Sequence, residues 1–276
     1  MTITDTAIRR IPVPPRRRRP RTLAVGGAIV AVLLVVHVIA WRTTEMSFAS
    51  LLDGAGGMAE FLSEAIPPDL SADVLGPSLA GALVTLWIGL LGTTLSIPFA
   101  LLLALAAARG TAPGPVVYQA ARGLLSFLRA VPDIVFALIF VTAVGLGPFP
   151  GVLALVFHNV GVMGKLWAET IEDADPGPPT ALRSAGAGRL QVAAHALLPS
   201  LTPQLAGLLL YRFDVNVRSS LVLGLVGAGG IGFLINQSIQ LFRFDEMLTH
   251  ILVVLVLIVA VDQLSALVRR HLGSAA

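Results

Sequence analysis

The densest group of polar side chains in this chain lies within an apolar stretch in its last third. The group consists of Arg212, Asp214, Asn216, Arg218, Ser219 and Ser220. On a helix, Arg212, Asn216 and Ser219 share one face, and Asp214 and Arg218 are one turn apart. Ionisable side chains inside a membrane are costly and often functional. Two interpretations remain open: Asp214 and Arg218 neutralise each other and pin helices together, or the group lines a polar path for a charged or hydrophilic solute.

A glycine-rich segment, VGAGGIG, follows at residues 226–232. Its glycines are Gly227, Gly229, Gly230 and Gly232, and glycine allows positive φ angles and close backbone approach. A phosphate-binding loop would need a strand before the segment and a Lys-Ser/Thr pair after it, and both are missing. The segment therefore predicts a break in a membrane helix that serves as a hinge or gate, with plain close helix packing as the alternative.

Other kinds of chemistry have little support in the sequence. No paired carboxylates, Ser-His-Asp set or metal-ligand spacing stands out, and the absence of cysteine excludes disulfides and thiolate sites. His158 is expected to pack within its helix, and Lys165 to reach the membrane interface or pair with Glu169. We therefore expect no metal, no cofactor and no catalytic site in this chain.

The elements that position these side chains must be membrane helices. The chain has 276 residues, of which 55% are hydrophobic and 13% charged, and its mean hydropathy is +0.84. A soluble domain of this length could not bury so much apolar surface, so the expected fold is all-α, polytopic and solvated by lipid. The arginines cluster beside apolar segments rather than among aromatic residues, which argues against nucleic-acid binding.

Hydropathy predicts six transmembrane helices. They are expected at residues 23–41, 79–108, 116–144, 152–171, 196–225 and 247–268. A basic, proline-rich and disordered arm at residues 1–22 precedes the first span, and a short tail at residues 271–276 follows the last. Residues 42–77 are acidic and carry apolar side chains at helical spacing, which predicts an extracytoplasmic loop with an interfacial helix. The distribution of lysine and arginine places both termini in the cytoplasm.

The predicted transmembrane domain, residues 78–270, contains an ordered loop at residues 172–199. Its main part reads TALRSAGAGRLQVAAHALLP, from Thr180 to Pro199. The loop begins with helix-forming residues and allows a break at Gly186 and Gly188 before the next apolar segment starts. A loop that only joins two spans needs no such structure. The pattern therefore suggests a cytoplasmic docking surface for a soluble partner.

This loop resembles the signature of the permeases of binding-protein-dependent ABC importers. That signature is Glu-Ala-Ala, three residues, Gly, nine residues and Ile-x-Leu-Pro. The matching residues are Ala181, Gly186, Leu198 and Pro199. Thr180, Leu182 and Ala196 replace the glutamate, the second alanine and the isoleucine. The resemblance implies that the matching residues belong to a coupling helix that contacts an ATPase.

The chain more specifically resembles phosphonate-type permeases, in the stretches at residues 127–155, 158–172 and 211–232. With the loop, the resemblance covers roughly residues 78–270. It implies the type I ABC importer permease architecture and a multi-pass protein of the inner membrane. It also implies a homodimer, two cytoplasmic ATPase subunits that hold ATP and Mg, and an extracytoplasmic phosphonate-binding protein.

The function implied by the resemblance is uptake of phosphonates or a related phosphorus oxyanion such as phosphite or phosphate. One alternative is a permease of the same architecture for another solute, such as methionine. Another, from a different class, is a channel or membrane sensor that works without an ATPase.

Overall fold

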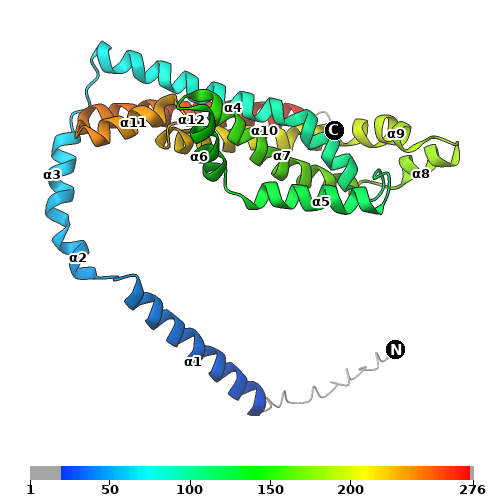
Figure 1. The fold of residues 1–276 in the computed structure, drawn as a ribbon, viewed down its shortest axis with the longest axis horizontal. Coiled ribbons are helices and arrows are strands. Elements are labelled where there is room, and N and C mark those ends of the chain that lie inside the picture. Colours follow the sequence, from blue (N-terminus) through cyan, green and yellow to red (C-terminus); the bar gives the residue numbers. More distant parts are fainter. Residues whose placement is uncertain (1–19, 274–276) are drawn as a thin grey trace, which may run out of the picture. The chain divides into compact units, whose positions relative to one another are not determined.

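The computed structural model describes residues 20–273, which form helices and connecting turns with no strand in that range (Figure 1). The chain divides into two units, of which the first ends at Ala59 and the second begins at Glu60. Within residues 20–273, five helices are long and apolar enough to cross a membrane, or six if one bent pair counts as a span. This confirms the prediction of about six spans. Residues 1–19 of the predicted basic arm and 274–276 of the predicted tail lie outside the described residues.

The first unit contains α1 (Pro20–Thr43), α2 (Phe48–Asp53) and the start of α3 (Ala55–Ala65). The helix predicted for residues 23–41 is present and slightly longer. Ser47 begins α2 because its Oγ accepts a hydrogen bond from the Ser50 N–H at 3.2 Å. The predicted helix in the acidic loop is thus present as α2 and α3, while its interfacial position remains a prediction.

The second unit holds the remaining helices. They are α4 (Ala72–Ala107), α5 (Pro115–Ala130), α6 (Asp133–Val144), α7 (Pro148–Glu172), α8 (Gly177–Ser184), α9 (Arg189–Val192), the π-helix η1 (Ala193–Leu197), α10 (Leu198–Leu225), α11 (Gly230–Gln240) and α12 (Phe244–Gly273). The predicted acidic loop ends at Ser71, six residues before its expected end, because α4 begins at Ala72. Asp73 lies in the first turn of α4, where a carboxylate is favoured by the helix dipole.

The small residues of α4 allow α7 and α10 to pack closely against it. A Cβ added to Gly92 would lie 2.5 Å from Cβ of Leu155 in α7, and one added to Gly89 would lie 2.9 Å from Cγ2 of Val217 in α10. Large apolar side chains point outward on another side. They include Leu79, Leu83, Trp87, Leu91, Leu95 and Phe99. Helix α4 therefore presents small residues to protein and large ones to the surroundings, as expected for a helix in lipid.

The span predicted for residues 116–144 is wrong as a single helix. Helices α5 and α6 meet at an angle of 84°. The break falls at Val131 and Pro132, which have extended backbone conformations. Proline lacks an N–H to continue the helix and disfavours helical geometry in the residue before it. The prediction that one helix continues through Pro132 is therefore wrong.

Candidate functional site

The loop predicted at residues 172–199 is ordered and contains two short helices, α8 and α9. Ala181 lies in α8, and the predicted break is present between Ser184 and Arg189. Gly186 lies within this break and has a φ of 86°. This backbone conformation is energetically unfavourable for any residue other than glycine. Gly188 is the N-cap residue of α9, and its N–H donates to Oε1 of Gln191 at 2.8 Å. Together α8, α9 and the α4–α5 connection (residues 108–114) are called the α8–α9 end.

The π-helix η1 joins α9 to α10 just before the Leu198-Pro199 pair. The Leu198 N–H donates to the carbonyl of Ala193, five residues back. Pro199 has no N–H, and its ring would clash with the carbonyl of His195 in a regular α-helix. A wider turn relieves that clash. The Leu198-Pro199 pair that ends the signature thus explains why an irregular turn precedes α10.

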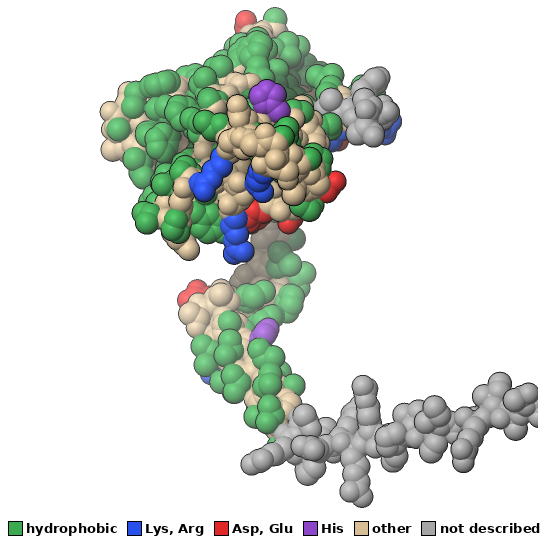
Figure 2. Space-filling view, turned by 90° about the vertical axis from the view of Figure 1, so that its right-hand side faces the viewer, with side chains coloured by type: hydrophobic (Ala, Val, Ile, Leu, Met, Phe, Trp, Pro, Cys, Tyr) green, Lys and Arg blue, Asp and Glu red, His purple; other side chains and the backbone are tan. Residues whose placement is uncertain are grey.

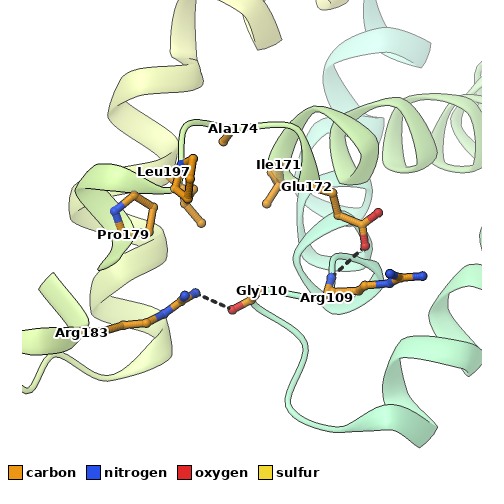
Figure 3. A pocket seen from close by; sticks show the side chains of 9 residues that line it. Arg109, Gly110, Ile171, Glu172, Ala174, Pro179, Arg183 and Leu197 are labelled. Atoms are coloured by element: carbon orange, nitrogen blue, oxygen red, sulfur yellow. Dashed lines mark hydrogen bonds between the residues drawn. The ribbon is translucent and has the colours of Figure 1, made fainter. Parts of the chain in front are cut away.

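Figure 2 views the second unit from the α8–α9 end, where basic side chains lie among backbone and uncharged polar side chains. A cavity of about 280 Å³ opens here between α8, the end of α7 and residues 109–110 (Figure 3). Arg183 lies at one side of it and donates through Nη2 to the Gly110 carbonyl at 3.2 Å. Across the cavity, Glu172 accepts from the Arg109 N–H at 2.9 Å. The cavity is therefore bordered by the loop and by the ends of α4 and α7.

Glu172 also ties α5 to α7 through an ion pair with Arg122, at 2.7 Å. Arg122 lies over the ring of Tyr118, 4.9 Å from its centroid. The Tyr118 hydroxyl accepts a hydrogen bond from Nε of Arg109 at 3.2 Å. This hydrogen bond and the nearby Glu172 raise the pKa of Arg109 above its ordinary value, so its guanidinium stays charged.

The polar group of α10 is divided among three helices rather than gathered on one open face. Asp214 and Arg218 form an ion pair at 2.9 Å, as their spacing predicts, with side chains 7% and 48% exposed. Arg212 instead reaches α7, where its Nε donates to Oδ1 of Asn159 at 2.6 Å. The Asn159 amide in turn donates to the Gly92 carbonyl of α4 at 3.3 Å.

Asn216 and Ser220 are fully buried against α4. The Asn216 amide donates to Oγ1 of Thr93 at 2.7 Å, and the Ser220 hydroxyl donates to the Thr85 carbonyl at 2.9 Å. Ser219, between them, is partly exposed. A translocation path lined by these residues remains a prediction, and Arg218 is the member of the group with most surface exposed.

The glycine segment breaks the helix at the predicted place, since α10 ends at Leu225 and α11 begins at Gly230. Gly227, Gly229 and Gly230 have φ values of 94°, 75° and 73°. The Gly147 N–H donates to the Gly227 carbonyl at 3.0 Å, so this turn meets the turn between α6 and α7. The Ile231 N–H donates to Oγ1 of Thr85 at 2.9 Å. The break is therefore held in place, and its role as a hinge or gate remains a prediction.

Gly232 supports the close-packing alternative as well. A Cβ there would overlap the Leu221 carbonyl of α10, so only glycine lets α11 start beside the end of α10. Close packing and a break are thus both properties of the segment.

A family model described as the binding-protein-dependent transport system inner membrane component matches residues 96–274. The chain belongs to this family. The phosphite transport system permease protein PtxC of Stutzerimonas stutzeri is 42% identical over 245 residues, covering 89% of this chain and 88% of that protein. The phosphate-import permease protein PhnE of Mycolicibacterium smegmatis is 40% identical over 237 residues, covering 85% of this chain and 44% of that protein.

Solved structures agree with the family in fold. A chain of the MetNI methionine ABC transporter, in an inward-facing conformation, matches with a TM-score of 0.61 and 19% identity, covering 72% of this chain and 96% of that chain. A chain of an amino acid ABC transporter matches with a TM-score of 0.59 and 19% identity, covering 71% and 94%. The type I permease architecture and the multi-pass inner-membrane location are thus confirmed.

Two sets of contacts in this permease were not anticipated from the sequence. The first is a pair of acceptors on α4, the hydroxyl oxygens of Thr85 and Thr93, which accept hydrogen bonds from α11 and α10. The signal in the sequence was two hydroxyl residues about two turns apart in an apolar helix. The second is the hydrogen bond from Arg183 to the main-chain carbonyl of Gly110. Every residue has such a carbonyl, so no side chain marks this contact in the sequence.

Proposed function

We propose that this permease is the membrane subunit of an ATP-driven importer of phosphorus oxyanions, with phosphite and phosphonates as the leading candidates. The observation that carries the proposal is the similarity over nearly nine tenths of the chain to a phosphite transport permease. The chain itself would be non-catalytic, and ATP and Mg would bind to a partner ATPase.

The α8–α9 end is proposed to face the cytoplasm and to receive the ATPase through Ala181, Gly186, Leu198 and Pro199. Arg109, Arg122, Arg183 and Arg189 gather at this end, which the positive-inside rule favours for the cytoplasmic side. The opposite end of the second unit, where α4 and α12 begin (Figure 1), carries Asp69, Asp73, Asp245 and Glu246, with Arg243 paired to Glu246. That acidic end would face a solute-binding protein. Both termini would then be cytoplasmic.

A pair of permease chains is proposed to enclose the translocation path. Arg218 and Arg212 would lower the cost of passing an anion, and the neighbouring hydroxyl and amide groups would offer hydrogen bonds. Alanine at both arginines, in a complex that still assembles, should reduce transport. Unchanged uptake would remove these residues from the path, and loss of assembly would assign them to contacts within the helix bundle, the ion pair of Arg218 with Asp214 and the hydrogen bond of Arg212 to Asn159.

The decisive experiment measures ATP hydrolysis by the reconstituted complex, with the wild-type loop and with Gly186→Arg. Loaded binding protein would be supplied with a phosphonate panel, phosphite, phosphate or methionine. Stimulation by one phosphorus ligand, lost in Gly186→Arg, supports both the coupling role and the solute class. No stimulation by any ligand and no effect of the substitution would contradict the importer.

A permease for another solute is the second candidate. The fold match to a methionine transporter permits it, although an identity of 19% speaks only for the fold. Stimulation by methionine alone would favour this candidate.

A further inference from the structure

Two arginines of the 172–199 loop bind the main chain of the α4–α5 connection. Arg183 donates to the Gly110 carbonyl at 3.2 Å (Figure 3). Arg189, at the start of α9, donates through Nη1 to the carbonyls of Ala112 and Pro113, at 2.9 Å and 2.7 Å. These are charge-assisted hydrogen bonds, which are stronger than bonds between neutral groups.

The connection that they bind is a structured extension of α4. The Thr111 hydroxyl donates to the Leu105 carbonyl at 2.6 Å, and the Ala112 N–H donates to the Ala108 carbonyl at 2.9 Å. Arg122 of α5 donates to the Ala107 carbonyl at 3.1 Å. A force applied to residues 110–113 would therefore reach α4 and α5 with little loss.

The covalent route from the loop to α10 is less regular. It passes through the π-helix η1, whose wider turn interrupts the regular α-helical hydrogen bonds between α9 and α10. The arginine contacts thus offer a second route by which motion of the loop can be transmitted. This route bypasses η1 and reaches α4 and α5.

We propose that Arg183 and Arg189 are positioning residues that fasten the coupling loop to residues 108–114, so that the ATPase moves α4 and α5 together with α7 and α10. The inference rests on the proposed coupling role of the loop. It assigns no contact with solute or ATP to either arginine.

The test compares Arg183→Ala, Arg189→Ala and their double variant in the reconstituted complex. Ligand-stimulated ATP hydrolysis should persist, whereas solute transported per ATP should fall by about fivefold or more in the double variant, the lower range of coupling between sites. Arg189→Lys should restore part of the ratio because an ammonium group can still donate to two carbonyls. Arg270→Ala is the matched control, since Arg270 is an exposed arginine whose side chain makes no hydrogen bond or ion pair within the described residues.

Crosslinking keeps the inference testable if the arginine variants do not assemble. The chain has no cysteine, so Pro113→Cys and Leu190→Cys introduce the only thiols. A short flexible bismaleimide between them should leave transport at the rate of the uncrosslinked pair, because the two segments would move as one. Block of transport by the crosslink would overturn the inference.

The outcomes separate this inference from the proposed function. A wild-type complex without ligand-stimulated hydrolysis contradicts the proposed function and with it the fastening role. Wild-type stimulation together with an unchanged transport ratio in the double variant contradicts the fastening role alone.

Discussion

The α8–α9 end and the α4–α10–α11 packing use polar groups in opposite ways. At the α8–α9 end, exposed arginines donate to main-chain carbonyls, as Arg183 does to Gly110. Between α4 and α10, buried uncharged groups pair with each other, as the Asn216 amide nitrogen does with Thr93, although Asn216 Oδ1 has no hydrogen-bond partner in the described residues. Exposed charged contacts contribute little to the stability of the whole fold, whereas a buried group left unpaired costs about 1–3 kcal/mol. The α8–α9 end can therefore be held together locally without adding to the rigidity of the helix packing, which serves as a fixed frame.

The largest expected effect comes from filling the close approach of α10 and α11. In Gly224→Val, the new Cβ would lie 2.6 Å from the Gly229 carbonyl oxygen and 2.8 Å from Cα of Gly232, and neither backbone atom can rotate away. We expect a loss of about 3 kcal/mol, measured as a lower thermal midpoint of the detergent-extracted chain.

Gly207→Val is the matched control in the same helix, since nothing lies within 4 Å of its Cβ position. An equal midpoint shift in both variants would show that valine in α10, and not the close approach, is responsible.

The Asp214–Arg218 pair should respond asymmetrically. Arg218→Ala leaves a carboxylate that is 7% exposed without its partner, whereas Asp214→Asn leaves an arginine that is 48% exposed. We expect Arg218→Ala to lose about 2 kcal/mol, below the usual range for a buried pair because Arg218 is half exposed, and Asp214→Asn to lose less. Thermal midpoints of both single variants and the double variant would measure this. Equal losses would contradict the burial argument.

Thr85→Val tests the hydroxyl that holds the start of α11. Valine has nearly the same shape but leaves the Ile231 N–H, now bonded at 2.9 Å, without its acceptor. The expected loss is about 1–2 kcal/mol in the same thermal assay. Thr85→Ser keeps the hydroxyl and should lose clearly less. If both lost the same amount, the methyl group and not the hydrogen bond would matter.

The smallest expected effect is that of Gly186→Ala. Its positive φ makes alanine unfavourable by about 1 kcal/mol, yet nothing lies within 4 Å of the new Cβ. The strain can be released by opening the loop locally, so the thermal midpoint should hardly move while ligand-stimulated hydrolysis slows. Gly123→Ala, at an exposed helical glycine with open space around it, should leave ligand-stimulated hydrolysis unchanged and raise the thermal midpoint slightly, because alanine is favoured over glycine inside a helix. If Gly186→Ala lowered the thermal midpoint as much as Thr85→Val, the loop would be as rigidly held as the packing between α4, α10 and α11.

Much of the fold follows from hydropathy and local breakers. Apolar length predicts α1, α7, α10 and α12 within a few residues, and Gly186 marks a break that the structure has. The bend between α5 and α6 could not be derived, because proline is tolerated inside some membrane helices, including Pro98 in α4. Whether a proline breaks a helix depends on neighbours that hydropathy does not identify.

The candidate sites divide in the same way. The Asp214–Arg218 pair is one helical turn and is visible in the sequence. Arg212 binds Asn159 across 53 positions, and Asn216 binds Thr93 across 123, so their partners depend on how the helices pack. A helical face calculated for α10 alone put Arg212 and Asn216 together, although they contact different helices.

The arginine contacts at the α8–α9 end have a consequence for how such chains diverge. Residues 110, 112 and 113 contribute only carbonyl oxygens, which every amino acid supplies, Pro113 included. Substitutions among these three positions can therefore accumulate without loss of the contact, provided that the backbone keeps its path. Related sequences would show no paired changes between this connection and the arginines, so a physical link present in every member could leave no trace in their comparison.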